Sequence, residues 1–498
     1  MKAILPDFER ETAVPLYLQL FGHMRDMILS GDISPGEKLP SLRNLSESLE
    51  ISLTTVSQAY DQLLVEGYIH SVPKRGYFVS EMYYPGPASG SKEAAPDRQT
   101  PKANQAPPAD HTATAGLPSR EEPQAQMFRA AEGPVINVPE MAYDLSSFDF
   151  VKWKKCLSRV LSEHPEALLF ESEPQGEEAL RQAITKYVYT SRGVRCTPDQ
   201  VVIAAGTQQI TAHMATILRM MGIENVALEE PGYAPVNSMF RDRGFAISRV
   251  PVGADGIAIE RLPMNIRSAA YVAPQNQFPT GAVMPAGRRY RLLEWAREND
   301  SYIIEDDYDS ELRYFGKPAL ALQGIDTAGR VVYLGSFSST LFASIKISYM
   351  ILPPKMAELF RSISSEYTQS CSKTEQLALA LFMESGAYQT GIRKLRRSYS
   401  QKLRATLRAL APLTHLTPHD TNSGVGLLID ADPDALPKGK TSGDLVKEAA
   451  ELGIPVSLLS PSENSGPIRL DLYYSRLPLD SIPGMIVKLY EKWYDSNE

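Results

Sequence analysis

Two stretches in the middle of the chain combine residue types that suit a phosphorylated small molecule. Gly206, Thr207 and Gln208 follow an apolar run of strand type and open a helical pattern. Backbone amides at a helix start carry partial positive charge, so this turn is suited to a phosphate group. Further along, Asp306 and Tyr308 end another apolar strand. They provide a carboxyl and a phenol group at a strand end, where ordinary structural polar residues are the alternative interpretation.

A second set of candidates near the N-terminus suits a nucleic acid. Its members are short polar or phenolic side chains and cations, namely Thr54, Thr55, Ser57, Tyr60, Arg43, Lys74 and Arg75. The hydroxyl groups stand at the start of a predicted helix, from which they could reach base edges and phosphates in a major groove. The cations would add salt-dependent contacts to the DNA backbone.

The first 80 residues must position this second set. Apolar residues recur at helical spacing over 16–28, and Ser41 can cap a second helix that ends at Leu49. A third helix is predicted over 54–66, followed by strand-like runs at 68–70 and 76–79 that flank a basic hairpin tip. The order helix, helix-turn-helix, hairpin predicts a winged helix.

This segment resembles the GntR-type winged helix along essentially all of its length. The stretches PLYLQL, GDISPGEKLPS, TTVSQAYDQLLVEGYI and KRGYFV carry the resemblance in the expected order. It implies a DNA-binding domain over residues 1–80. That segment has 7 Lys and Arg against 10 Asp and Glu, a balance of −3. DNA binding must therefore come from uneven charge distribution, and a winged helix used only for protein contacts is the alternative.

The rest of the chain divides into two regions of different composition. Residues 81–140 are rich in Pro and Ala and lack aliphatic clusters, so they predict a disordered linker. From about residue 141, strand-like runs alternate with longer helical patterns. The strand-like runs lie at 200–205, 225–229, 269–273, 301–305 and 330–334. This alternation predicts an α/β domain with a mainly parallel sheet and helices on both faces.

Composition narrows the class of protein. Hydrophobic residues make up 43% of the 498 residues and charged residues 22%, with no apolar run long enough to cross a bilayer. Acidic residues and prolines interrupt the N-terminus, so we expect a cytoplasmic protein without a secretory signal. The spacing of Cys156, Cys196 and Cys371 matches no disulfide framework, and the scattered histidines give no metal motif. The net charge of −8 requires that any basic DNA-binding surface be local.

Residues 141–498 resemble the sensor domain of the MocR group of GntR-type regulators. The stretches that carry the resemblance are EPQGEEALRQAITKYVYTSRGVRC, VVIAAGTQQ, EEPGY, FPTG, IIEDDYDSE and VVYLGSFSSTLFASIKISYMILP. The resemblance implies a fold-type I, pyridoxal-phosphate-dependent aminotransferase-like domain. Its large part would span about 176–350, and a smaller C-terminal α+β subdomain would span 351–498. Such domains build their sites at a homodimer interface, which implies two DNA-binding heads per particle.

The resemblance also assigns roles around a pyridoxal phosphate. Asp306 would pair with the pyridine nitrogen, and Tyr308 would hydrogen-bond the phenolic oxygen of the ring. Tyr233 would stack on the ring. Arg469, in IRLDLYYS, would grip a substrate carboxylate with two parallel hydrogen bonds.

The chain departs from the family pattern at four positions around the cofactor. The run that reads like GTFSKSLAPSLRLGY in related sequences is GSFSSTLFASIKISY here, which puts Ser339 at the Schiff-base lysine position and Lys346 at that of a phosphate-binding arginine. Asn276 stands where histidine is common, and Glu171 stands near the usual tyrosine. Four departures favour natural divergence, and a single engineered change at Ser339 is the alternative. A serine hydroxyl cannot form the imine, so transamination should be absent or very slow.

These observations predict a DNA-binding transcriptional regulator without catalytic residues or metal. Its degenerate site would bind a small amine, an amino acid or a pyridoxal-phosphate-like effector, with the cofactor held non-covalently if it binds. The candidate effector-binding residues are Gly206, Thr207, Gln208, Tyr233, Asn276, Asp306, Tyr308, Ser336, Ser338, Ser339, Lys346 and Arg469. Two alternatives remain, namely a working aminotransferase with an added DNA-binding domain, and a regulator whose large domain is a ligand-free dimerisation scaffold.

Overall fold

The computed structural model describes eight stretches of the chain, namely residues 16–65, 67–72, 75–80, 148–163, 165–314, 320–419, 424–460 and 466–494. The predicted linker over 81–140 lies outside the described residues, as does Lys74 at the tip of the predicted hairpin.

The N-terminal segment is the predicted winged helix. Its elements are α1 (Leu16–Leu29), α2 (Leu42–Leu49), α3 (Leu53–Val65), β1 (Ile69–Val72) and β2 (Gly76–Val79). The two strands pair antiparallel, with Val72 opposite Gly76 at the hairpin end. Each predicted helix and strand is present, with bounds that differ from the prediction by at most two residues.

Local chemistry explains where the helices of this segment begin. The hydroxyl of Ser41 accepts a hydrogen bond from the Asn44 amide at 3.2 Å, which confirms its predicted role as N-cap of α2. Ser52 does the same for α3 through the Thr55 amide at 3.1 Å. The apolar faces of the three helices then close one small core, in which Leu20, Met24 and Val56 are fully buried.

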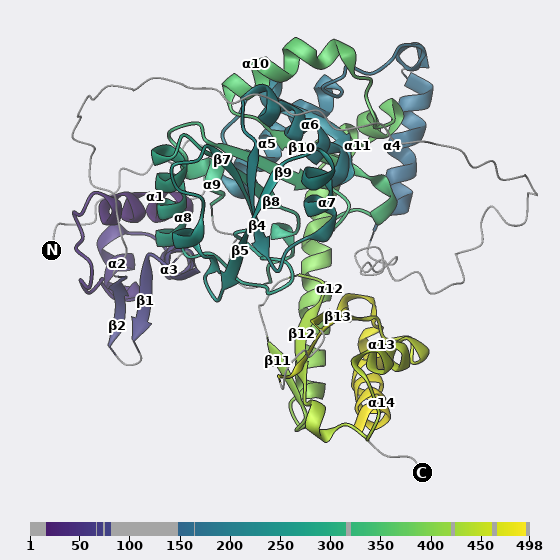
Figure 1. Cartoon of the computed structure of the whole chain (residues 1–498). Coiled ribbons are helices and arrows are strands. Elements are labelled where there is room, and N and C mark those ends of the chain that lie inside the picture. Colours follow the sequence, from purple (N-terminus) through teal and green to yellow (C-terminus); the bar gives the residue numbers. More distant parts are fainter. Residues whose placement is uncertain are drawn as a thin grey trace, which may run out of the picture. The chain divides into compact units, whose positions relative to one another are not determined.

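The larger part of the chain is organised by an eight-stranded sheet, which confirms the predicted α/β class (Figure 1). In order across the sheet, the strands are β3 (Val201–Ala205), β10 (Ile347–Ile351), β9 (Val331–Ser336), β8 (Tyr302–Asp307), β7 (Ser268–Val272), β4 (Asn225–Glu230), β5 (Ala246–Gly253) and β6 (Gly256–Ile257). Neighbours from β9 to β5 run parallel, whereas β10 is antiparallel to both β3 and β9, and β6 is antiparallel to β5.

Helices cover both faces of this sheet because its strands are apolar on both sides. Along β3, Val201 and Ile203 join one core cluster, while Val202 and Ala204 join another on the opposite face. The first cluster includes side chains from α4 (Phe150–Glu163), α5 (Glu178–Arg192) and α11 (Lys373–Glu384). The second includes side chains from α6 (Gly206–Met220), α7 (Ala234–Asp242) and α10 (Pro354–Ile363). A third includes side chains from α8 (Ala286–Glu298) and α9 (Leu322–Ile325).

A second, smaller sheet lies in the C-terminal part of the chain. The long helix α12 (Ala387–Leu410) leads into four antiparallel strands in the order β11 (Leu416–His419), β12 (Leu427–Ala431), β14 (Ile468–Leu472) and β13 (Val456–Ser460). Helices α13 (Ser442–Glu451) and α14 (Ile482–Tyr494) share its core, in which Trp493 is fully buried. We call this part, residues 387–494, the small lobe, and the part around the eight-stranded sheet the large lobe.

None of the helices in the described residues combines the length and the apolar character that crossing a bilayer requires.

Candidate functional site

The main cavity of the described structure lies where the parallel strands of the large lobe end. It has a volume of about 670 Å³, and the carboxyl ends of β3, β4, β7, β8 and β9 all contribute lining residues. Ligands of open α/β sheets bind at this edge, because the loops that leave the strands diverge there. The small lobe adds residues 424–426, Leu428, Asp471 and Tyr473 to the lining.

One end of the cavity is built to hold an anion. Gly206, with a positive φ of 79°, turns the chain from β3 into α6, so the amino end of a 15-residue helix lies at the cavity. Thr207, Ser336 and Ser338 add hydroxyl groups, and Lys346 adds a positive charge just before β10. Hydrogen-bond donors, a helix amino end and a cation together suit a phosphate group.

A half-buried carboxyl group, that of Asp306, lies on the strand β8. The hydroxyl of Tyr271, on the neighbouring strand β7, donates to Oδ2 of Asp306 at 2.5 Å. Burial raises the pKa of Asp306 to about 6, although the hydrogen bond from Tyr271 acts to lower it. The carboxyl group can therefore be ionised at neutral pH while it remains sheltered from water.

A second carboxyl group, Glu229 at the end of β4, is only 8% exposed. Its Oε2 accepts a hydrogen bond from Gln277 at 3.2 Å and a longer one from the Ala273 amide at 3.3 Å. Its Oε1 is buried without a hydrogen-bond partner. Burial raises the pKa of Glu229 to about 8, so the group is largely protonated at neutral pH.

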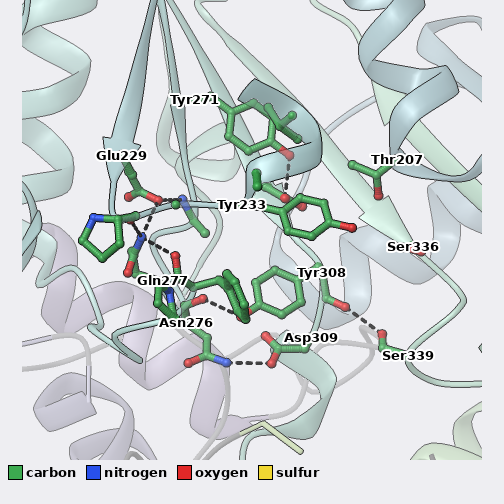
Figure 2. Close-up of a pocket in the computed structure, with 18 of the residues that line it drawn as sticks. Thr207, Glu229, Tyr233, Tyr271, Asn276, Gln277, Tyr308, Asp309, Ser336 and Ser339 are labelled. Carbon is green, nitrogen blue, oxygen red and sulfur yellow. Dashed lines mark hydrogen bonds between the residues drawn. The ribbon is translucent and has the colours of Figure 1, made fainter. Parts of the chain in front are cut away.

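A chain of hydrogen bonds links the predicted residues in the middle of the cavity (Figure 2). Tyr308 donates to the Asn276 carbonyl at 3.0 Å, and the Asn276 side chain donates to Asp309 at 2.6 Å. The hydroxyl of Ser339 donates to the Tyr308 carbonyl at 2.6 Å. Tyr233 packs against the edge of Phe278, with ring centroids 6.1 Å apart. These hydrogen bonds fix the positions of Tyr308, Asn276 and Ser339 relative to one another.

Two glycines of the small lobe each lie next to a carboxyl group, Gly426 next to Asp471 of the small lobe and Gly424 next to Asp309 of the large lobe. A Cβ atom on Gly426 would overlap the Asp471 carboxylate, and one on Gly424 would lie 3.5 Å from Oδ2 of Asp309. Gly424 also has a positive φ of 78°. The glycines therefore leave space that the two carboxyl groups occupy.

Arg469 is the one predicted effector-binding residue that does not line the cavity. It is on β14, and its guanidinium binds Asp430 of β12 through two hydrogen bonds of 2.8 and 2.9 Å. Its side chain is 44% exposed, whereas that of Asp430 is 12% exposed. The structure therefore corrects the expected placement, because Asp430 takes the two-pronged contact that a substrate carboxylate was expected to make.

The predicted DNA-contacting residues differ in how far their side chains are exposed to solvent. Thr54 and Arg43 are exposed on α3 and α2, and Thr55 and Ser57 are half-buried. Arg75 is exposed at the hairpin, with its guanidinium 5.6 Å from the ring centre of Phe78. The accessible side chains thus lie on the second and third helices and on the wing.

The expected DNA contact of Tyr60 is wrong. Its ring is fully buried in the core of the winged helix, and its hydroxyl donates to the Pro40 carbonyl at 2.9 Å. A side chain in this position ties the start of α2 to α3 and does not reach a groove.

Comparison with known families agrees with both halves of this architecture. Residues 16–79 match the family described as bacterial regulatory proteins, gntR family. Residues 137–454 match the family described as aminotransferase class I and II.

Curated relatives match this chain along most of its length, across both of these regions. The chain is 36% identical to the HTH-type transcriptional regulator YdeL of Bacillus subtilis (strain 168) over 464 residues, which cover 91% of this chain and 92% of the relative. It is 32% identical to the probable rhizopine catabolism regulatory protein MocR of Rhizobium meliloti over 400 residues, which cover 79% and 77%. The chain belongs to the MocR-type regulators of the GntR family.

Solved structures support the fold of the large domain of this MocR-type regulator. The kynurenine aminotransferase of Pyrococcus horikoshii matches with a TM-score of 0.60 and 22% identity, over 72% of this chain and 90% of that one. The α-aminoadipate aminotransferase LysN of Thermus thermophilus matches with a TM-score of 0.60 and 23% identity, over 70% and 90%. At this level of identity the likeness shows an aminotransferase fold.

The cavity of the MocR-type regulator has the donor set that pyridoxal phosphate needs. The anion-binding end suits the phosphate, and the sheltered carboxyl of Asp306 suits the pyridine nitrogen. Among the described residues that line the cavity, Lys346 is the single lysine, and it belongs to the anion-binding end. Across the described residues, no group of three or more His, Cys, Asp or Glu side chains could hold a metal ion.

Among the polar residues of the cavity that sequence reasoning missed are Glu229, Tyr271, Asp309 and Asp471. Glu229 and Asp309 stand within motifs that carry the family resemblance, so their place at strand ends was a usable signal. Tyr271 and Asp471 lie inside strands, where alternation alone gives no reason to choose them. Their roles depend on which strands become neighbours.

Proposed function

We propose that the aminotransferase-like domain of this regulator binds a small amine, amino acid or pyridoxal-phosphate-like effector without transamination. The observation that carries this proposal is the position of Ser339. Its side chain lines the cavity, and its hydroxyl donates a hydrogen bond to the Tyr308 carbonyl. By resemblance, this is the position from which a lysine would attach to the cofactor.

A serine at this position removes two functions of that lysine. An alcohol cannot condense with an aldehyde as an amine does, and it cannot move protons at neutral pH as a lysine amine does. Lys346 does not replace it, because its side chain lies toward Gly206 at the start of α6, where a Cβ atom on that glycine would be 4.0 Å from the lysine Cδ. Lys346 supplies charge for a phosphate.

The remaining residues would hold a pyridoxal phosphate non-covalently. Thr207, Ser336, Ser338 and Lys346 would bind the phosphate, and Asp306 would pair with the ring nitrogen. When bound, the cofactor would supply an electrophilic aldehyde and an electron-withdrawing ring. In this chain, those properties would serve recognition of an amine.

An exposed apolar surface supports a homodimer. Leu169 is 82% exposed, Phe170 72% and Val151 68%, and all three lie in or next to α4 and the short helix that follows it. Two adjacent large apolar side chains as exposed as Leu169 and Phe170 are unusual on a free surface. A second copy of the chain would cover them and pair two winged helices, whose binding free energies add on a two-part operator. A DNA-binding regulator of this kind would act in the cytoplasm.

Switching follows from the two-lobed lining of the cavity. A ligand that contacts both Asp306 in the large lobe and residues 424–426 in the small lobe binds the closed arrangement more tightly than an open one. That difference in affinity sets the size of the response, typically about 1 to 3 kcal/mol.

An absorbance titration with pyridoxal phosphate tests the proposal. The natural chain should show saturable binding with the spectrum of the free aldehyde. Ser339→Lys should gain the longer-wavelength absorption of a lysine-linked cofactor, while the neighbouring control Ser338→Lys should not. A covalent spectrum in the natural chain would overturn the non-covalent site.

A thermal-shift screen with pyridoxal phosphate, amines and amino acids separates the sensor from a ligand-free scaffold. A rise in melting temperature with at least one of these compounds is expected. Constant melting temperature with all of them would contradict the sensor function and favour the scaffold, while DNA binding by the winged helix would be unaffected.

A further inference from the structure

The cavity holds more carboxyl groups than its cations can balance. Its acidic lining residues are Glu229, Glu230, Asp306, Asp309 and Asp471, and its basic lining residues are Arg249 and Lys346. Arg249 and Glu230 form an ion pair of 2.5 Å in which both side chains are more than half exposed. Among the described residues, Lys346 alone then faces four carboxyl groups.

These four carboxyl groups converge on one phenol group. Burial raises the pKa of Tyr308 well above its usual range, and the nearby charges of Asp309, Asp306, Asp471 and Glu229 raise it further. Within the described part of the chain, none of these four carboxyl groups is in an ion pair, and Oε1 of Glu229 is buried at the cavity without any partner. Burial raises the pKa of Glu229 to about 8 and that of Asp309 well above its usual range, so without a nearby cation burial favours their protonated forms. A cation bound among these carboxyl groups would favour their ionised forms.

Neighbouring residues fix the positions of two of these carboxyl groups, Asp309 of the large lobe and Asp471 of the small lobe. Asp309 accepts a hydrogen bond from Asn276 at 2.6 Å, and its side chain is adjacent to Gly424. Asp471 is adjacent to Gly426, where any Cβ atom would displace its carboxylate. Gly424 and Gly426 are at most about 7 Å apart along the chain, so Asp309 and Asp471 face the same short segment from opposite lobes.

The cation that would bind an effector carboxylate is engaged elsewhere. Arg469 lies two residues from Asp471 on β14, and its Nε and Nη2 both donate to the carboxylate of Asp430. Burial alone would raise the pKa of Asp430, but the hydrogen bonds from Arg469 and His419 lower it. Asp430 therefore stays ionised and keeps Arg469 outside the cavity.

We infer that the effector of this regulator is an amine without a carboxylate, whose ammonium group binds between Asp309 of the large lobe and Asp471 of the small lobe. This inference rests on the proposed sensor function and narrows it from amines and amino acids to amines alone. A carboxylate at the same place would face like charges, whereas an ammonium group would receive charge-assisted hydrogen bonds from both lobes. The same contact would hold the lobes together.

The burial of Asp471 adds a proton linkage to this binding. Burial raises the pKa of Asp471 to about 6, although a hydrogen bond from Tyr473 lowers it. Asp471 lies close enough to the phenol of Tyr308 to raise its pKa, as do Asp309 and Asp306 of the large lobe. A bound ammonium group would lower the pKa of Asp471 again, so amine binding should strengthen as the pH rises from 5.5 to 7.5.

Calorimetric titration of the full-length protein with matched pairs tests the inference. The pairs are cadaverine against lysine and putrescine against ornithine, in which each amino acid is the diamine with one added carboxylate. At pH 7.5, each diamine should bind at least tenfold more tightly than its amino acid. Equal or tighter binding of the amino acids, or no binding of either diamine, would overturn the inference.

Substitutions of single residues test whether Asp309 and Asp471 bind the diamine. Asp471→Asn and Asp309→Asn should each weaken diamine binding at least tenfold, whereas Asp434→Asn, an exposed aspartate of the small lobe, should not. Asp430→Asn should free Arg469 and narrow the difference between diamine and amino acid. Melting curves would confirm that each variant is folded, and unchanged diamine affinity in a folded Asp471→Asn variant would refute the site.

The same titrations distinguish a failure of the amine inference from a failure of the proposed sensor function. If amino acids bind and alter operator affinity while diamines do not, the amine inference fails and the sensor function stands. If neither class nor pyridoxal phosphate binds, the sensor function itself fails.

Discussion

Tyr271 and Asp306 join neighbouring parallel strands through a hydrogen bond of 2.5 Å from the phenol to the carboxylate. The bond opposes the effect of burial, which alone would drive the pKa of Asp306 above about 6. The phenol thus keeps this sheltered carboxyl group ready to pair with a positively charged ring nitrogen.

Tyr271→Phe should weaken the binding of pyridoxal phosphate about tenfold at pH 7.5, because a hydrogen bond to a charged group contributes about 1.5 to 3 kcal/mol. The loss should be smaller at pH 5.5, where Asp306 is largely protonated in both proteins. Absorbance titrations at the two pH values measure it, with Tyr367→Phe, outside the cavity, as control. Equal losses at both pH values would contradict this account of Asp306.

Glu229→Gln should stabilise the protein at high pH. The folded-state pKa of Glu229 is raised from 4.5 to about 8, so the folded protein binds more protons than the unfolded chain in this interval. Stability from this group is therefore lost as the pH rises from about 4.5 to 8. The amide removes the penalty, and the free energy of unfolding should rise by about 1 to 3 kcal/mol at pH 8.

At pH 3.5 or below, the same substitution should be nearly neutral, because this pH lies a full unit below 4.5 and keeps Glu229 mostly protonated in both states. Melting curves at the two pH values measure this difference. Glu224→Gln, an exposed glutamate beside β4, is the control and should show no pH-dependent change. A gain in stability that is the same at both pH values would show that Glu229 is not the titrating group.

Gly426→Ala should destabilise the small lobe by about 1 to 3 kcal/mol, because its Cβ atom overlaps the Asp471 carboxylate. Asp471→Ala should relieve the overlap, so the double variant should be more stable than the sum of the two single changes predicts. Denaturant unfolding of the four proteins in this cycle measures the coupling. Gly443→Ala, which has only an ordinary contact of 3.6 Å, is the control.

Arg43→Ala and Arg75→Ala should each weaken DNA binding at all sequences, because both arginines are exposed on the winged helix. Each should reduce the slope of log affinity against log salt concentration by about 1, as expected for one lost phosphate contact. Fluorescence anisotropy at several salt concentrations measures both quantities. Arg241→Ala, exposed on α7, should leave them unchanged.

Tyr60→Phe should act on stability and not on DNA contacts. Loss of the hydrogen bond to the Pro40 carbonyl should cost about 1 kcal/mol of unfolding free energy. Well below the melting temperature, DNA affinity and its salt dependence should remain those of the natural chain. A changed salt slope in Tyr60→Phe would restore the tyrosine to the DNA-binding face.

The sequence by itself determined the architecture and one end of the site. Helical spacing, the Ser41 cap and paired strand-like runs predicted the winged helix, and alternating strands and helices predicted the mainly parallel sheet. Gly206, Thr207 and Asp306 could be found because strand ends and helix starts are local features. Parallel strands bring such ends together at one edge, so local order along the chain already places them in a common site.

The electrostatic balance of the cavity was decided only by the tertiary structure. Arg469 and Asp430 lie on strands that are neighbours in space and distant in sequence, so nothing local shows that the arginine is engaged. The side chain of Asp471 reaches the cavity because Gly426, just before the start of the neighbouring strand, has no side chain in its way. The side chain of Tyr60 points inward because α3 packs the face that bears Tyr60 into the core of the winged helix. Periodicity shows that a side chain belongs to an element, but the partner that balances its charge depends on packing between elements.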